Sequence, residues 1–227
     1  MSPSFSAVQI LDRPQSGSLQ RELSRVTAEI LAWLPKIDLL TSEARRGIIA
    51  RYSSVLEGNF IYWMTGAYLA AKSGEARAII EDNLLTEVRD CHPGMLRRFA
   101  LASYSAPGDL DSLSILNRLS PVRLFVGRLD AVPLIAMMAF FEGFIQQFMP
   151  YLAELARRQG SEDQEYTDVH GVCDIEHSEE LLHALELEME LVSSHRDPSE
   201  NLYEGVYLLR DLLQAIIKSP GVFKNVN

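Results

Sequence analysis

The stretch VPLIAMMAFFEGFIQQFMPYLAEL, residues Val132–Leu155, is the most apolar part of the 227-residue chain. Glu142, Gln146 and Gln147 lie at its centre. Placing the carboxylate alone in the middle of a bilayer costs roughly 2 kcal/mol or more, so a membrane span is a poor explanation. The stretch instead predicts a long helix, 131–158, buried in the core of a helical protein.

Apolar residues at helical spacing flank this segment on both sides, and the alternating β-branched runs that form strands are nearly absent. One flanking helix is expected over 109–129, with a break around Pro121. Another is expected over 161–194, where Ser161 and Gln164 have the spacing of a capping box. The sequence therefore predicts an all-α fold, a bundle of about seven helices.

The composition narrows the classes of function. The chain has 21 Lys and Arg against 31 Asp and Glu, a formal net charge of −10, and no basic run to bind phosphates, so no nucleic-acid partner is expected. Two cysteines, Cys91 and Cys173, cannot form a disulfide framework; they suit a reducing cytoplasm and are expected to be small buried residues. Residues 1–17 lack the features of a signal peptide and are expected to be a loose lead-in to a single domain, 18–227.

The motif with the clearest chemistry is His170-Gly-Val-Cys-Asp174-Ile-Glu-His177. At about 100° per residue, positions i, i+4 and i+7 of a helix lie within roughly 60° of one another. Two imidazoles and a carboxylate then share one patch, and such a set with open coordination positions suits Fe(II) and oxygen chemistry. The alternative for this patch is a polar face turned to solvent.

Other segments offer matching donors. Glu142 is flanked by phenylalanines, and a carboxylate in such surroundings must be paired, protonated or bound to a metal, unless it faces solvent from a narrow polar stripe. Glu87 and His92 lie where a helix is expected to end before Pro93, a place from which a side chain can reach inward. For His92 the alternative is a capping or surface histidine.

Competing motifs carry less weight. Glu180-Leu-Leu-His183 matches the Glu-x-x-His element of ferritin-like di-iron bundles, but those proteins need two such elements and no second one exists here. Glu180 and His183 are therefore expected to be surface or supporting groups. Glu57 is expected to be exposed, with a role as a further ligand or substrate contact left open, and Glu81 or Asp82 are substitutes for Glu87.

Together these segments resemble the haem-oxygenase-like di-iron oxidases and oxygenases. The last metal helix of that family carries His-x3-Asp-x2-His, which the motif at 170–177 reproduces. An earlier family segment, Asn-Leu-x-x-Glu followed by His-Pro and Leu-x-x-Phe, is similar to Asn83–Glu87, His92-Pro93 and Leu96–Phe99. The resemblance covers about residues 75–185. The full set of expected metal ligands is Glu87, His92, Glu142, His170, Asp174 and His177.

The resemblance implies an O2-dependent oxidoreductase with two Fe(II) ions per chain, acting on a small substrate of the amino-acid type in secondary metabolism. Compact members of the family include one that converts a tryptophan derivative to a nitrile. Phe140, Phe141 and Phe144 are expected to position an apolar or aromatic part of the substrate. An external electron donor and a homodimer are further expectations.

Three alternatives stay open at this point. The same family contains fatty-acid decarboxylases and desaturases. The same bundle hosts metal-free enzymes, including those of thiamine salvage, although these use a nucleophilic cysteine in place of the His/Asp/His face. An iron-binding helper protein would hold iron without using O2. Haem oxygenase itself fits poorly, because it needs an axial histidine early in the chain and no histidine precedes His92.

Overall fold

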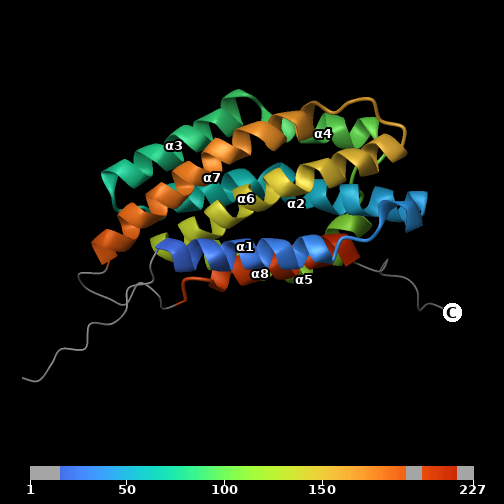
Figure 1. Cartoon of the computed structure of the whole chain (residues 1–227). Helices are drawn as coiled ribbons and strands as arrows, with labels where there is room; N and C mark the ends of the chain where they lie inside the picture. The colour runs from blue at the N-terminus through green and yellow to red at the C-terminus, as the bar shows by residue number, and fades with distance from the viewer. Residues whose placement is uncertain (1–15, 193–200, 219–227) are drawn as a thin grey trace, which may run out of the picture.

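The computed structural model describes residues 16–192 and 201–218, apart from the side chains of 16, 172–175 and 192. Within these ranges the regular secondary structure is entirely helical, which confirms the predicted all-α class (Figure 1). The elements are α1 (Ser16–Ala32), the 3-10 helix η1 (Ile37–Leu39), α2 (Ser42–Ala70), α3 (Gly74–Arg89), α4 (His92–Ala102), α5 (Asp109–Val126), α6 (Ala131–Arg158), α7 (Glu165–Val192) and α8 (Glu204–Lys218).

The helices surround α6, which packs against α1, α2, α4, α7 and α8. In Figure 1, α3, α4 and α7 lie on one side of α6, and α1, α5 and α8 lie on the other. By length and composition α6 could cross a membrane, but 83% of its most apolar 18-residue window is buried inside the protein. Burial in the protein accounts for its apolar sequence, as the composition of 131–158 predicts.

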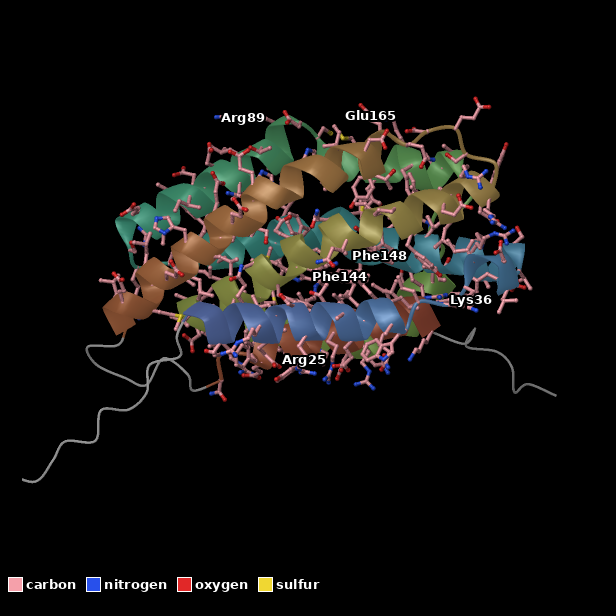
Figure 2. The ribbon with its side chains drawn as sticks, in the orientation of Figure 1. Arg25, Lys36, Arg89, Phe144, Phe148 and Glu165 are labelled. Atoms are coloured by element: carbon pink, nitrogen blue, oxygen red, sulfur yellow. The ribbon has the colours of Figure 1, made fainter. Side chains whose placement is uncertain are left out.

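Aromatic side chains of α6 form much of this core. Phe144 and Phe148 stack with ring centroids 5.2 Å apart. In Figure 2 both lie between α6 and α1, whereas Arg25 of α1 and Arg89 of α3 project outward on opposite sides of the protein. Phe141 meets Trp63 of α2 edge to face at 5.6 Å. These contacts fix the rotation of α6 about its own axis, because a turn of the helix would bring its polar residues into the same space.

Several local predictions are wrong. The helix around Pro121 is not broken: α5 runs through it to Val126. Ser161 does not open a capping box, because its hydroxyl bonds within the loop to the backbone of Asp163, and α7 begins at Glu165. The count of about seven helices is too low for the described ranges, which contain eight α-helices.

Only the last two residues of the predicted lead-in and one of the two cysteines can be compared with the structure. Of the expected lead-in, 1–17, the first 15 residues lie outside the described part of the chain, and Ser16 and Gly17 belong to α1. Cys91 is exposed rather than buried, because it adopts a left-handed conformation (φ 57°) between α3 and α4. The side chain of Cys173 is outside the description.

A buried carboxylate on α7 holds the turn between α2 and α3. Glu188 is 0% exposed, and its Oε1 accepts hydrogen bonds from the backbone N–H groups of Lys72 at 2.7 Å and Ser73 at 2.6 Å. Ser73 is the residue that caps α3. This contact therefore sets where α3 starts and how it lies along α7, which carries His170 of the site described below.

Replacing Glu188 with Ala should lower the free energy of unfolding by about 1–2 kcal/mol, because two partly buried N–H groups lose their acceptor. Glu188→Gln, which keeps an acceptor oxygen, should lose less. Urea unfolding followed by circular dichroism measures both. Glu176→Ala, an exposed change on the same helix, is the control and should alter stability by no more than about 0.5 kcal/mol. An equally small effect of Glu188→Ala would contradict the assignment.

Candidate metal site

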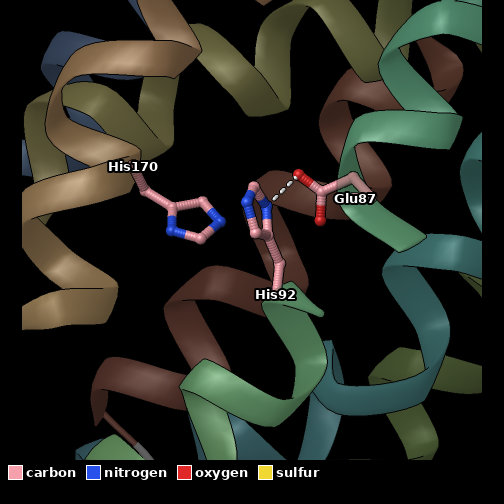
Figure 3. Close-up of side chains that lie close together, drawn as sticks. All are labelled: Glu87, His92 and His170. Carbon is pink, nitrogen blue, oxygen red and sulfur yellow. Dashed lines mark hydrogen bonds and ion pairs between the residues drawn. The ribbon is translucent and has the colours of Figure 1, made fainter. Parts of the chain in front are cut away.

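Three buried side chains from three helices meet at one point. Glu87 near the end of α3, His92 at the start of α4 and His170 on α7 each offer a donor atom, and these atoms lie within 4.8 Å of one another. The side chains are 3%, 3% and 5% exposed. Figure 3 shows His92 lying between Glu87 and His170. All three were predicted as ligands from the sequence, and the fold brings them together.

The chain reversal between α3 and α4 places His92. Asp90 ends α3, Cys91 adopts the left-handed conformation, and Pro93 lies in the first turn of α4. Proline is well suited to the first turn of a helix, where its missing N–H would have no partner inside the helix. The reversal turns His92 back towards Glu87, so that two residues five positions apart become hydrogen-bonded.

Each of the two histidines in this cluster, His92 and His170, is oriented by a hydrogen bond at Nδ1. His170 Nδ1 donates to the backbone carbonyl of Tyr166 at 2.8 Å, and His92 Nδ1 bonds to Glu87 Oε1 at 2.7 Å. A carbonyl can only accept, so Nδ1 of His170 carries the hydrogen and its Nε2 keeps a lone pair when the ring is neutral. Metal-binding histidines are held in the same way, by a carboxylate or carbonyl on the nitrogen that faces away from the metal.

The pKa values of the two histidines, His92 and His170, are shifted in opposite directions. Burial lowers the pKa of His170 to about 4, with smaller repulsive contributions from His92 and His177. Burial also acts to lower the pKa of His92, but the hydrogen bond and charge of Glu87, with the charge of Asp90, outweigh it and raise that pKa. His170 is therefore neutral at pH 7, the form in which imidazole binds a metal.

The cluster faces a small cavity that Glu142 also lines. The cavity has a volume of about 20 Å³. It is large enough for one water molecule or ion, since about 10–15 Å³ suffices for a water. Glu142 comes from α6 and is 1% exposed. Apolar side chains complete the wall: Leu56, Phe60, Pro93, Leu96 and Ile145.

The remaining two predicted ligands lie on α7. His177 is 8% exposed, it is near enough to His170 to affect its pKa, and its Nδ1 has no hydrogen-bond partner among the described residues. It does not line the 20 Å³ cavity. Asp174 lies in α7 between these histidines, but its side chain is outside the description. Asp174 therefore stays a prediction.

The alternative carboxylates are elsewhere. Glu81 and Asp82 are exposed on α3, so they do not replace Glu87. Glu57 is partly buried and forms an ion pair with Arg97 of α4 rather than being exposed alone.

The Glu180–His183 element has a supporting position between α3 and α7. Glu180 Oε2 accepts a hydrogen bond from Asn83 Nδ2 at 2.8 Å. His183 is 55% exposed at its side chain and lies 3.8 Å from Glu75. Both are thus supporting or surface groups, as predicted.

Tyr166, one turn before His170, belongs to no motif and was not among the predicted site residues. Besides its carbonyl bond, its ring lies 4.2 Å from the His170 ring, centroid to centroid, and it lines the cavity. Its hydroxyl lies 2.9 Å from that of Tyr52 on α2. The one available signal was position, because a residue at i−4 presents its carbonyl to a histidine on the same helix face.

The donor set fits a divalent transition metal. Imidazole nitrogens combined with carboxylate oxygens suit Fe(II), and also Mn(II) or Zn(II). The supporting observations are the burial of four donors around a cavity of ionic size and the unpartnered Nδ1 of His177. Comparisons with protein-family models, with curated proteins and with solved structures found no match to the chain. The function must therefore be argued from the site itself.

The lowered pKa of His170 predicts an acid-sensitive fold in the metal-free protein. The ordinary pKa of 6.5 falls to about 4 on folding. As the pH drops through this interval, the unfolded chain binds a proton that the folded protein does not. The free energy of unfolding should fall by about 2 kcal/mol between pH 7 and pH 5 from this group alone.

The measurement is urea unfolding at both pH values in the presence of a chelator. His170→Gln should remove this part of the pH dependence, whatever its effect on absolute stability. His183→Gln is the control, because that side chain is 55% exposed. The same acid loss in the wild type and in His170→Gln would contradict the assignment.

Proposed function

We propose that this protein is an O2-dependent non-haem di-iron oxidoreductase that oxidises a small amino-acid-type substrate. The observation that carries the proposal is the convergence of Glu87, His92 and His170 from three helices within 4.8 Å, with Glu142 lining the same cavity. The choice of iron and O2 rests on the likeness of the His-x3-Asp-x2-His and Glu/His-Pro segments to haem-oxygenase-like di-iron enzymes.

Six residues would hold the metal. Glu87, His92, Glu142 and His170 line the 20 Å³ cavity, and His177 and Asp174, which follow His170 in α7, are the two further ligands that a second ion would need. Bound Fe(II) supplies the capacity to bind and reduce O2, which amino-acid side chains lack. The set of three histidines and three carboxylates leaves little uncompensated charge when two divalent ions bind, which limits the cost of burying them.

The protein side chains orient the ligands and keep water out. Glu87 holds His92 through Nδ1, and the Tyr166 carbonyl holds His170, so each Nε2 is left to bind a metal. Leu56, Phe60 and Leu96 line the cavity with apolar surface. An apolar lining disfavours bulk water at the metal position, which selective oxidation would require.

A second cavity beside the site suits the polar end of an amino acid. It has a volume of about 240 Å³ and lies between α2, α4 and the turn that follows α4. Arg97 and Glu57, which line it, pair with each other and could instead pair with the carboxylate and the ammonium group of a zwitterion. Ser53, 1% exposed, also lines it, and its hydroxyl has no hydrogen-bond partner among the described residues.

This cavity adjoins the metal site through shared helices. Leu56 and Leu96 line the metal cavity, and their chain neighbours Glu57 and Arg97 line the larger one. In the proposal, a substrate held by its polar end between α2 and α4 presents its side chain to the metal past these leucines. The phenylalanines expected to hold an apolar substrate, Phe140, Phe141 and Phe144, are instead packed in the core, 1%, 0% and 0% exposed.

Anaerobic titration with Fe(II), followed by gel filtration and metal analysis, tests the metal centre. The wild type should bind about two ions per chain. His170→Ala and Glu142→Ala should each reduce Fe(II) affinity by about 10-fold or more, because each removes a ligand. His183→Ala is the matched control, with an exposed imidazole on the same helix. A folded wild type that takes up no Fe(II) would favour the metal-free alternative.

O2 consumption by the iron-loaded protein separates the remaining alternatives. Consumption stimulated by amino acids supports the proposal, and stimulation confined to fatty acids favours the decarboxylase or desaturase alternative. Iron binding with no substrate-dependent consumption would favour a helper protein. An oxygen electrode with parallel amino-acid and fatty-acid panels gives this readout directly.

Arg97→Ala should raise KM for an active amino acid at least about 10-fold and leave kcat nearly unchanged, because it removes a contact to a part of the substrate that does not react. Arg98→Ala is the control: it is the next residue of α4, it pairs with Glu165, and it does not line the 240 Å³ cavity. Steady-state kinetics on both variants measures the effect. Equal KM values for Arg97→Ala and the wild type would remove the 240 Å³ cavity from the substrate path.

A further inference from the structure

A further cavity lies where α1 meets α6 and α7, and its volume is about 240 Å³. Figure 1 shows α1 running along α6, and this α1 cavity opens beside that contact. Its described lining residues are shared neither with the metal cavity nor with the cavity of Glu57 and Arg97. Pockets for drug-sized molecules measure roughly 300–1,000 Å³, so the α1 cavity suits a smaller ligand.

Polar side chains from three helices line the α1 cavity. There are six of them: Gln20, Ser24, Thr27, Gln146, Ser178 and Glu179. The three on α1 stand at positions i, i+4 and i+7, which lie within roughly 60° of one another on a helix surface. One strip of α1 is therefore turned to the cavity, and the polar residues of α6 and α7 complete the set. Rigid helices hold all six side chains in place.

These six side chains are free to bind a ligand. None of them has a hydrogen-bond partner among the described residues. Thr27 is the most buried of the six, at 5% exposed. A buried hydroxyl without a partner costs free energy, and almost all such groups in proteins are satisfied by protein atoms, water or a ligand. The α1 cavity thus collects hydrogen-bonding groups that the fold itself does not use.

The remainder of the wall is apolar. It is formed by Leu23, Ala139, Phe140 and Leu182. A wall that is partly apolar and partly hydrogen-bonding matches a molecule that has both kinds of surface. Sugars and polyols are such molecules, because their C–H groups are apolar and their hydroxyl groups both donate and accept hydrogen bonds.

The charge of the wall disfavours anionic ligands. Glu179 is the one ionisable side chain among the described lining residues, and the chain carries a formal net charge of −10. Phosphates and carboxylates are bound by Arg and Lys, which are missing from this set. An acidic side chain instead accepts hydrogen bonds from sugar hydroxyls, as one does from ribose in dinucleotide-binding folds.

We propose that the α1 cavity binds an uncharged, hydroxyl-rich small molecule of the sugar or polyol class. Its hydroxyl groups donate to the carboxylate of Glu179 and to the carboxamide oxygens of Gln20 and Gln146, and they accept from the amide and hydroxyl groups of the wall. Thr27 provides the most buried of these contacts. The proposal does not depend on the metal chemistry, because the α1 cavity shares no described lining residue with the metal cavity.

Isothermal titration calorimetry of the full chain with pentoses, hexoses and linear polyols tests the site. At least one compound should bind with a millimolar dissociation constant or tighter. Ser24→Trp places an indole at an exposed position of the wall and should abolish this binding. Ala28→Trp, at an exposed position of α1 outside the wall, is the matched control and should leave binding unchanged. Circular dichroism verifies that each variant is folded.

Thr27→Val gives a finer readout, because valine keeps the shape of the side chain and removes its hydroxyl. It should raise the dissociation constant about 3- to 10-fold through the loss of one hydrogen bond. Thr65→Val is the control, because the Thr65 hydroxyl is bonded to the Ile61 carbonyl within α2.

Three results would overturn the proposal. The first is that no compound binds at tens of millimolar, since the α1 cavity would then hold only solvent. The second is that sugar phosphates or amines bind more tightly than the parent sugars, since the wall would then recognise charge. The third is binding that persists unchanged in Ser24→Trp, since the ligand would then lie on another surface.

Discussion

Burial of α6 along almost its whole length is the constraint on which the rest of the structure depends. A helix that is apolar all round is stable in water only if other helices enclose it, and five of them do so here. Enclosure has a chemical consequence for Glu142. Its carboxylate is carried into the protein interior with the helix, and it faces the same cavity as His92 and His170. The core and the candidate site are therefore two results of one packing arrangement.

The site concentrates polar groups in a place where each must be satisfied by protein atoms or by a ligand. Glu87 and His92 satisfy each other, and Tyr166 supplies a carbonyl to His170. These bonds leave the remaining imidazole nitrogens directed away from their partners. A cavity of about 20 Å³ fits an ion better than an organic molecule. In the proposed function the 20 Å³ cavity holds the metal, and the 240 Å³ cavity lined by Glu57 and Arg97 holds the substrate.

The surface of the protein also carries apolar side chains, on α5. α5 turns one apolar side to the core and another to solvent, an arrangement that costs solubility unless a partner covers it. α2 lies next to α5 and α4, and it lines both the metal cavity and the proposed substrate cavity, through Leu56 and Glu57.

The amino-acid sequence by itself determined the fold class and the chemistry of the donors. Helical periodicity and the apolar run at 131–158 are local properties, so they could be read without a structure. The donor residues Glu87, His92, Glu142 and His170 could also be selected, because ionisable side chains next to apolar ones need partners. The break at Pro121 was wrong for a physical reason: packing of α5 between α2 and α8 outweighs the loss of one backbone hydrogen bond.

Only the tertiary structure decided which donors meet and how they are held. The left-handed conformation of Cys91 turns His92 towards Glu87, and the carbonyl of Tyr166 fixes His170. Glu188 sets the start of α3 from a helix distant in sequence. No periodicity or motif records the Glu188 contact, because it joins segments whose distance depends on how all the helices pack. The sequence determined what could bind a metal, and the packing decided where those groups lie.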